Sequence, residues 1–251
     1  MKVSILILTL NEQDNIKDCI LSVAPLSDDI LVLDSHSCDR TISIAKSQGA
    51  KVIEHKFSGW ASHQNWALKN ITFKYDWILY IDADERVTEE LINEILNLES
   101  DVYNAFKIYR NNKFISGESL KYSMKCPGIV RLFSKHHIKY EREINPIAIV
   151  NGAVGILQSK LIHYNFSKGL NEWILKHIEY AKREAQEFNL NVSNENLHFL
   201  KKRTKKLKYF RFIFRIIYQL FFKMGILDGY AGYRYAILIS FYEQLIEENM
   251  R

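Results

Sequence analysis

The sequence has few of the residues that mark linkers, disulfide frameworks or metal clusters. Only three prolines and ten glycines occur among 251 residues, which argues against linkers and low-complexity tracts, and there is no internal repeat. The three cysteines, Cys19, Cys38 and Cys126, are odd in number and widely separated, so they indicate neither a disulfide framework nor a zinc site. This cysteine usage fits a reducing, cytoplasmic setting.

Two nucleotide-binding motifs and a leader peptide are missing as well. The sequence contains no G-x-G-x-x-G and no G-x-x-x-x-G-K-[ST], so neither a dinucleotide fold nor a P-loop enzyme is indicated. The run 1–8 is apolar but short and lacks a cleavage site, so we expect a first strand and not a signal peptide. The remaining composition, 47% hydrophobic and 25% charged, is that of a globular protein with a sizeable core.

Apolar runs of strand length alternate with helical patterns through the first 110 residues or so. Strands separated by helices of this kind predict βαβ units and a mainly parallel sheet flanked by helices. The expected strands are 3–8, 29–34, 51–54 and 76–81, and helices are expected after each of them.

Polar residues gather where three of these strands end. Thr9, Asn11 and Glu12 follow the first strand, and Asp34 ends the second. In open parallel sheets ligands bind outside the carboxyl ends of the strands, so we expect one coordinated site there. A nucleotide could bind with its base held by Asn11 and Asp34 and its diphosphate on a metal. For Asn11 and Asp34 alone, helix capping is the alternative.

The third strand end carries two carboxylates, Asp82 and Asp84, after the apolar run 77–81. Residues two apart on a strand point to the same face, so these side chains should lie together. Adjacent carboxylates repel and should share a proton or hold a cation, and oxygen ligands suit Mg²⁺ or Mn²⁺. The alternative is a solvated junction where acids merely end a strand.

Taken in order, these motifs resemble family 2 glycosyltransferases with the GT-A fold. The motifs are T-L-N-E at 9–12, L-D-S-x-S-x-D-x-T at 33–41 and Y-I-D-A-D-E at 80–85. Residues 61–68, which include Gln64 and Asn65, are similar to the Q-x-N-W-A-L of the branch that contains lipopolysaccharide core β-1,4-glucosyltransferases. Residues 130–133, 161–164 and 225–232 are also similar to members of that branch, so the resemblance runs nearly from end to end.

The resemblance implies a Rossmann-like GT-A fold and inverting transfer of a hexose, with glucose preferred, from a UDP-sugar donor. The expected cofactor is Mg²⁺ or Mn²⁺, and the acceptor a lipopolysaccharide-core or other lipid-linked glycan. Carried over residue by residue, the donor-binding set is Thr9, Asn11, Glu12, Asp34, Gln64, Asn65, Asp82 and Arg131, and the metal set is Asp84, Asp82 and His163. For Arg131 the alternative is a surface ion pair, and for His163 a core or capping position.

Inversion requires a general base that takes the proton of the acceptor hydroxyl. Glu143 is the candidate and Glu141 the second choice, with a solvated charge run on a loop as the alternative. Relatives often carry His-Glu where this chain has Arg142-Glu143, and Pro-Asp where it has Pro127-Gly128. The acceptor side of the pocket can therefore differ from theirs.

The basic charge of the chain is concentrated near its carboxyl end. Residues 196–227 contain no acid and nine cations, which exceed the formal net charge of +5, so the rest of the chain is net acidic. Within 209–224, one polar stripe recurs every four residues among aromatic and aliphatic residues: Arg211, Arg215, Gln219 and Lys223.

This segment is interrupted by arginines and is shorter than the roughly 20 apolar residues that span a bilayer. A basic helix with aromatic residues lies well on an anionic membrane surface, which we take as a partner, whereas nucleic acid is not expected. The alternative is a helix packed on the core with its cations solvated.

We therefore predict two parts, a nucleotide-sugar-binding and catalytic domain over 1–168 and a helical, basic region over 169–251. The predicted location is cytoplasmic and peripheral, on the inner face of the cell membrane. Two rival functions stay open: a polyprenyl-phosphate or capsule glycosyltransferase, and a non-catalytic, membrane-bound nucleotide-sugar-binding protein.

Overall fold

The computed structural model describes residues 1–99, 102–143, 146–191 and 208–250, without the side chains of 187–191 and 208–211. The chain forms two compact units. The first unit comprises Met1–Asn111 and Cys126–Ser167, and the second comprises Asn112–Lys125 and Lys168–Arg251. The predicted division into a catalytic domain over 1–168 and a helical region over 169–251 stays a prediction.

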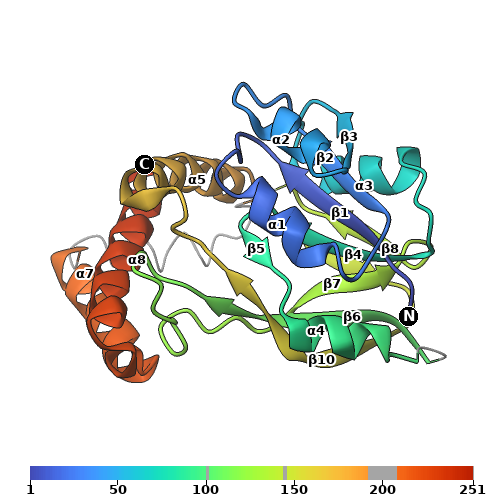
Figure 1. Cartoon of the computed structure of the whole chain (residues 1–251). Helices are drawn as coiled ribbons and strands as arrows, with labels where there is room; N and C mark the ends of the chain where they lie inside the picture. Colours follow the sequence, from blue (N-terminus) through green and yellow to red (C-terminus); the bar gives the residue numbers. More distant parts are fainter. Residues whose placement is uncertain (100–101, 144–145, 192–207, 251) are drawn as a thin grey trace. The chain divides into compact units, whose positions relative to one another are not determined.

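An eight-stranded mixed sheet forms the centre of the first unit, in the order β3-β2-β1-β4-β7-β6-β10-β5 (Figure 1). Its strands are β1 (Ser4–Thr9), β2 (Ile30–Asp34), β3 (Lys51–Glu54), β4 (Trp77–Asp82), β5 (Glu85–Arg86), β6 (Tyr103–Asn112), β7 (Ile129–Ser134) and β10 (Ala153–His163). The first four strands are parallel, as the βαβ pattern predicted. The pairs β4–β7, β6–β7 and β10–β5 are antiparallel, so the parallel part is confined to half of the sheet.

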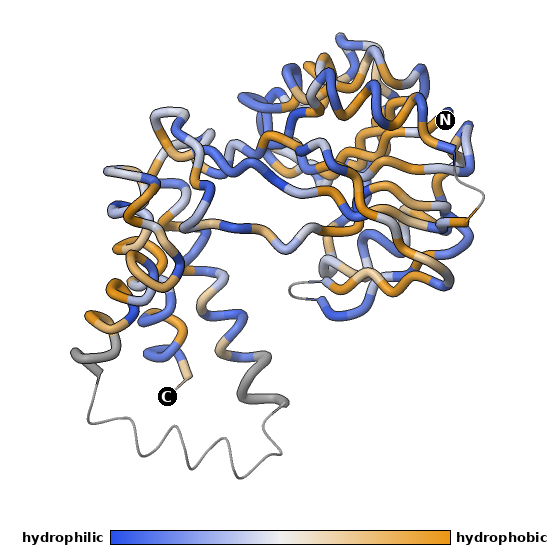
Figure 2. The backbone as a smooth tube through the Cα atoms, turned by 90° about the horizontal axis from the view of Figure 1, so that it is seen from below, coloured by the Kyte–Doolittle hydropathy of each residue, from blue (hydrophilic) through white to orange (hydrophobic). Residues whose placement is uncertain are grey.

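Helices α1 (Ile16–Val23), α2 (Thr41–Ser47), α3 (Trp60–Asn70) and α4 (Glu89–Leu96) flank this sheet (Figure 1). Successive residues of β1 serve opposite faces: Ile5 and Ile7 join the hydrophobic cluster of α1 and α4, whereas Leu6 and Leu8 join that of α3. Burial on both faces is the reason why β1 and β4 are continuous apolar runs. Figure 2 shows several hydrophobic (orange) stretches in the part of the chain that carries the N-terminus. The predicted α/β fold is confirmed.

A two-stranded sheet, β8 (Ile138–Glu141) and β9 (Ile147–Val150), packs beside α3. Asn65 of α3 fixes this contact with both ends of its amide. Its Nδ2 donates to the carbonyl of Tyr140 over 2.8 Å, and its Oδ1 accepts from the Tyr140 amide over 2.9 Å. The two hydrogen bonds extend the edge of β8 with a side chain.

The second unit is helical, as predicted, with α5 (Gly169–Asn191), α7 (Lys208–Ile217), the π-helical turn η2 (Tyr218–Phe222), the 3₁₀ turn η3 (Gly225–Asp228) and α8 (Gly229–Asn249). Helices α5, α7 and η3 all pack against α8. A Cβ atom at Gly232 would lie 1.9 Å from the carbonyl oxygen of Gly225, so this close approach of α8 and η3 requires glycine. The carboxylate of Asp228 accepts hydrogen bonds from the amides of residues 121–123, which ties η3 to that segment.

Two members of the polar stripe of α7 and η2 have their contacts within this unit, whereas Lys223 is exposed. Gln219 is buried, and Arg215 pairs with Glu243 of α8. Large apolar side chains on the other side, among them Phe214 and Phe221, are exposed. In the part of the chain that the structure describes, no helix is both long and apolar enough to cross a membrane.

Candidate active site

The carboxyl ends of β2, β1 and β4 lie side by side at one edge of the sheet. Thr9 of β1 pairs in register with Asp34 of β2, and Leu8 pairs with Asp82 of β4. The predicted residues of three separate sequence motifs are therefore brought to one edge. Their side chains then fall into two groups with different chemistry.

The first group is built around Asp34, which is fully buried. Its carboxylate accepts hydrogen bonds from the hydroxyl of Thr9 over 2.8 Å, the hydroxyl of Ser37 over 2.6 Å and the amide of Ser37 over 2.7 Å. These bonds fix the loop after β2. Asp34 therefore has a structural role in this loop as well as a position at the edge of the sheet.

The loops after β1 and β2 are also bonded to each other. The side-chain oxygen of Asn11 accepts from the amide of Cys38 over 2.8 Å, and the amide of Glu12 donates to the hydroxyl of Thr41 over 2.7 Å. Asn11 has φ +54°, a left-handed conformation that asparagine tolerates better than most residues. One hydrogen-bonded set of residues therefore lines this part of the edge, and we call it the wall: Thr9, Asn11, Glu12 and Asp34.

The second group contains the two acids of the D-x-D motif, and only the first of them lies on a strand. Strand β4 ends at Asp82, and Asp84 lies in the turn that leads to β5. Strand alternation therefore does not place the two carboxylates on one face. Oδ2 of Asp84 lies 3.4 Å from Nε2 of His163, whereas Asp82 has other partners.

Asp82 is neutralised by two arginines. Arg110 of β6 binds its carboxylate over 2.8 Å, Arg131 of β7 binds the same oxygen, and the hydroxyl of Tyr80 donates to the other oxygen over 2.8 Å. Burial opposes ionisation of Asp82, yet these two guanidinium groups and the Tyr80 hydroxyl hold its pKa well below the usual range. Repulsion between the two acids is thus relieved by cations of the protein itself.

Glu85 and Arg110 belong to this cluster, and the sequence reasoning missed both. Glu85 is fully buried, and its Oε1 lies 2.5 Å from Nε of Arg110 and 3.2 Å from Nη2 of Arg131. Its other oxygen accepts from the amide of Asp82 over 2.8 Å. The position of Glu85 directly after D-A-D was a visible signal, whereas nothing in the sequence around Arg110 distinguishes it. Arg131 pairs with buried acids and not with a surface acid.

Asp84 and His163 are the groups that fit a divalent cation. They offer a carboxylate oxygen and an imidazole nitrogen, both of which are donors that Mn²⁺ accepts. Among the described residues there is no group of three or more His, Cys, Asp or Glu side chains that could hold a metal. Two protein ligands suit a cation that takes its remaining ligands from phosphate and water, as Mg²⁺ usually does.

Helix α3 brings a further predicted residue to the buried side of this region. Gln64 is buried, and its Oε1 has no hydrogen-bond partner among the described residues. Buried amide oxygens are nearly always paired, so this atom is available to a bound group. Asn65, by contrast, uses its amide on β8.

Two histidines that the sequence analysis did not single out, His55 and His63, lie close to Asp34 and Ser35. Nδ1 of His63 lies 3.1 Å from Nδ1 of His55, and Nε2 of His63 lies 3.3 Å from the hydroxyl of Ser35. His55 stacks on Trp66 with ring centroids 3.8 Å apart, and its amide donates to the carbonyl of Asp34. Burial, helped by the neighbouring His55, lowers the pKa of His63 to about 4, so this imidazole is neutral at physiological pH.

The candidate base Glu143 lies at the amino end of α3. Its carboxylate accepts from the hydroxyl of Ser62 over 2.5 Å and from the Ser62 amide over 3.2 Å. A Cβ atom at Gly59 would lie 2.0 Å from Oε2 of Glu143, so the carboxylate sits where only glycine leaves room. Glu141 is exposed and pairs with Lys139 over 2.6 Å. The assignment of the general base stays a prediction.

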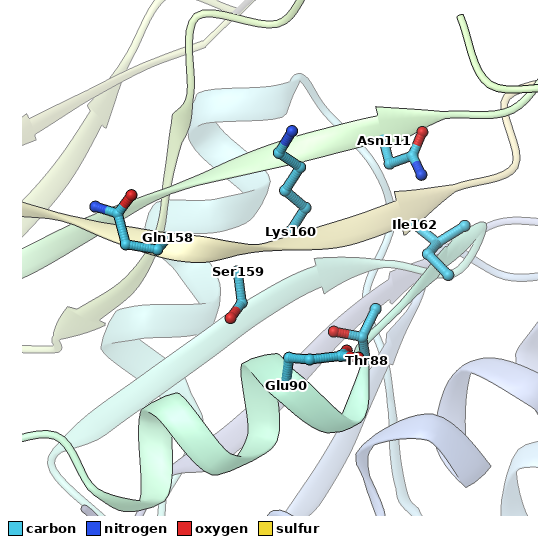
Figure 3. Close-up of a pocket in the computed structure, with 7 residues that line it drawn as sticks. All are labelled: Thr88, Glu90, Asn111, Gln158, Ser159, Lys160 and Ile162. Carbon is cyan, nitrogen blue, oxygen red and sulfur yellow. The ribbon is translucent and has the colours of Figure 1, made fainter. Parts of the chain in front are cut away.

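A shallow hollow of about 410 Å³ elsewhere in the first unit contains none of the predicted residues (Figure 3). It is lined by Thr88, Glu90, Asn111, Gln158, Ser159, Lys160 and Ile162. Asp84 and His163 are not among its lining residues.

The parallel strands with their flanking helices, and the acids at their carboxyl ends, define an α/β protein with a candidate site at one edge of its sheet. Residues 4–154 match the model of glycosyl transferase family 2. Because this match covers more than half of the chain, the chain belongs to glycosyl transferase family 2, and the predicted resemblance is confirmed at the level of the family.

Relatives with related sequences occur in Rickettsia. An uncharacterised glycosyltransferase of Rickettsia typhi is 26% identical over 258 residues, which cover 96% of this chain and 83% of the relative. An uncharacterised glycosyltransferase of Rickettsia bellii is 40% identical over 111 residues, which cover 43% of this chain and 37% of the relative.

Among solved structures, glucosyl-3-phosphoglycerate synthase from Mycobacterium tuberculosis, in complex with Mn²⁺, UDP and glucosyl-3-phosphoglycerate, is similar to part of the chain. The two are 24% identical with a TM-score of 0.37, and the match covers 43% of this chain and 44% of that one. The match thus spans less than half of either protein.

The ionic cluster around Glu85 predicts a large loss of stability in Glu85→Gln. The substitution leaves Arg110 and Arg131 with one carboxylate in a buried site, and breaking a buried pair costs about 3–5 kcal/mol. Urea denaturation should show this decrease in the free energy of unfolding. Glu89→Gln, at an exposed acid on α4, is the matched control and should differ little from the wild type. Equal stability of both variants would contradict the cluster.

The lowered pKa of His63 predicts that the protein loses stability between about pH 6.5 and pH 4. In this window the unfolded chain binds a proton at residue 63 and the folded chain does not, which amounts to about 3 kcal/mol at the acid end. His63→Gln should flatten that part of the pH profile of unfolding. His177 of α5, whose pKa burial also lowers to about 4, keeps its own contribution. His136→Gln, at an exposed position, should leave the profile unchanged.

Proposed function

We propose that this family 2 glycosyltransferase transfers a hexose, with glucose preferred, from a UDP-sugar to a glycan acceptor with inversion at the anomeric carbon. The observation that carries the proposal is the Asp84–His163 pair beside the arginine-bound Asp82, at the same strand edge as the wall built on Asp34. This edge offers ligands for a cation next to loop residues that would contact a nucleoside.

For the donor, Asn11, Glu12 and Asp34 would contact the nucleoside, with Thr9 supporting Asp34 from β1. The bonds that tie the two loops together support this assignment, because they fix the wall before the nucleotide arrives. The buried Oε1 of Gln64 would accept a donor hydroxyl or N–H group. Asn65 would act indirectly, by holding β8 on α3.

Asp84 and His163 would hold Mg²⁺ or Mn²⁺, and Asp82 would contact the ribose or the metal. When bound, the cation neutralises the charge that develops on the departing diphosphate. Arg131 and Arg110 keep Asp82 ionised, and they add fixed positive charge at the same edge. This preorganised charge would favour the leaving group without a rearrangement of the protein.

Glu143 would take the proton of the acceptor hydroxyl, with Glu141 as the second choice. In support, the carboxylate of Glu143 is exposed and is positioned by Ser62 at the amino end of α3, the helix that carries Gln64. The acceptor side differs from relatives at Gly128. This residue has φ +77°, and a Cβ atom there would lie 3.3 Å from the ring of Tyr109, so a larger residue would be strained.

The acceptor we propose is lipopolysaccharide core or another lipid-linked glycan, and the site of action is the cytoplasmic, inner face of the cell membrane, where the protein would bind peripherally. The acid-free, cationic stretch 196–227 supports an anionic membrane surface as a partner. A polyprenyl-phosphate or capsule acceptor is the alternative, since the same chemistry serves each of these.

A non-catalytic nucleotide-sugar-binding protein is the rival from another class. It would bind a UDP-sugar without consuming it. Hydrolysis of UDP-sugars in the presence of Mn²⁺ would distinguish an enzyme from such a binding protein. A thermal-shift panel of nucleotide sugars with and without Mn²⁺ identifies the donor, because a ligand that binds only the folded state raises the melting temperature.

Asp84→Asn should abolish Mn²⁺-dependent binding of UDP and leave the melting temperature nearly unchanged. The residue lies in a turn and provides a metal ligand, not core packing. Calorimetric titration with UDP, with and without Mn²⁺, measures the loss. Asp76→Asn, at an exposed acid just before β4, is the matched control and should bind as the wild type does. Undiminished metal-dependent binding in the Asp84 variant would contradict the proposed site.

Glu143→Gln should keep donor binding but lower the rate of transfer by roughly 10²-fold or more, the usual effect of removing a positioned acid–base group. Ser62→Ala removes the hydroxyl that holds the carboxylate and leaves the acid itself, so it should retain far more activity. If the two variants lose activity and stability equally, Glu143 only caps α3. If Glu141→Gln is the inactive variant, the base is Glu141.

A further inference from the structure

The second unit exposes a run of large apolar side chains from α7 to the start of α8. Phe214 is 62% exposed, Phe222 is 72% exposed and Tyr230 is 73% exposed. We call this run the apolar face, and it consists of Ile213, Phe214, Ile217, Phe221, Phe222, Met224, Ile226, Leu227, Tyr230 and Tyr233. Single exposed apolar residues are ordinary, but a gathering of this kind marks an interaction site.

Contacts inside the unit set the direction of the apolar face. Gln219 is buried and Arg215 pairs with Glu243, so these two members of the polar stripe lie on the side of α8, whereas Lys223 is exposed. Ile213, Phe214, Ile217 and Phe221 recur at helical spacing and must then lie on the outer side. These large apolar side chains are thus left to the surface, whereas an ordinary surface helix presents polar residues there.

The apolar face continues beyond α7 because the following elements pack on one another. The π turn η2 widens the end of the helix, so that Phe221 and Phe222 are both exposed. Met224, with φ +58°, turns the chain into η3, and the contact of Gly232 with Gly225 holds α8 against η3. Ile226, Leu227 and Tyr230 are therefore presented by the same packed elements.

The positive charge of the surrounding sequence indicates which kind of partner binds the apolar face. The stretch 196–227 carries nine Lys and Arg residues and no acid, and in its described part Lys223 is exposed within the apolar face. Two copies of so cationic a sequence would repel each other. An apolar, aromatic-rich surface in a cationic part of the sequence is complementary to an anionic bilayer, whose interface accepts aromatic rings and whose headgroups attract Lys and Arg.

We propose that the apolar face inserts into the interface of an anionic lipid bilayer, with its phenylalanines at acyl-chain level. This rests on the proposed function in one respect, that the acceptor is lipid-linked. The exposed aromatic side chains carry the binding, whereas Arg215 is paired with Glu243 and contributes little.

Sedimentation with vesicles tests this surface. The full chain should bind vesicles of phosphatidylglycerol and phosphatidylcholine, and part of this binding should resist salt because apolar insertion is not screened. The triple variant Phe214→Ser, Phe221→Ser and Phe222→Ser should partition roughly tenfold or more weakly. Leu175→Ser is the matched control, since Leu175 of α5 is similarly exposed at 58% but lies outside the apolar face.

A fluorescent variant measures insertion directly. In Phe222→Trp, added tryptophan emission should shift to the blue with these vesicles and be quenched by brominated acyl chains, whereas Leu175→Trp should show neither change. A wild type that ignores anionic vesicles, or a triple variant that binds as well as the wild type, would overturn the proposal. A wild-type dimer in sedimentation velocity that the triple variant abolishes would instead assign the face to a second copy.

Calorimetric titration with UDP in the same variants separates this proposal from the proposed function. The triple variant should bind UDP as the wild type does, which also shows that it is folded. If the wild type binds vesicles but no nucleotide, the proposed apolar face is supported and the proposed transferase site is contradicted. If it binds nucleotide but no vesicles, the transferase site is supported and the apolar face is contradicted.

Discussion

The buried ion-pair cluster of Arg110, Arg131, Asp82 and Glu85 is the interaction on which the first unit depends. Its members come from four strands: β6, β7, β4 and β5. The parallel half of the sheet ends at β4 and the antiparallel half begins at β7, so the cluster joins the two halves where they meet. Charges so well paired can be buried, but each would be costly if its partners were lost.

The same cluster decides what the D-x-D motif can do. With Asp82 bound by Arg110 and Arg131, the carboxylate that is left near an imidazole is Asp84, beside His163. The site therefore combines a cation-binding pair with fixed positive charge, which suits a diphosphate better than two bare acids would. The wall around Asp34 adds the nucleotide side, because β1 lies between β2 and β4 and brings both groups to one edge.

Much of this was predictable, and the failures have identifiable causes. Continuous apolar runs such as 3–8 and 77–81 predicted buried parallel strands, and the order of motifs predicted the family. The turn that holds Asp84 was not foreseen, because a strand pattern does not show the residue at which the strand ends. Glu85 and Arg110 were missed because an ion pair between residues 25 apart leaves no periodic signal in either segment.

By itself, the sequence determined the α/β class, the edge at which polar residues collect, the family and the cationic character of 196–227, because periodicity, motif order and charge are local properties of the chain. Tertiary structure decided which acid lies beside His163, which histidines lie close to Asp34, and which side chains of α7 are exposed. Periodicity shows that a helix has a polar stripe and an apolar side. Only the partner that covers one of them, here α8 with Glu243 against Arg215, decides which side is buried.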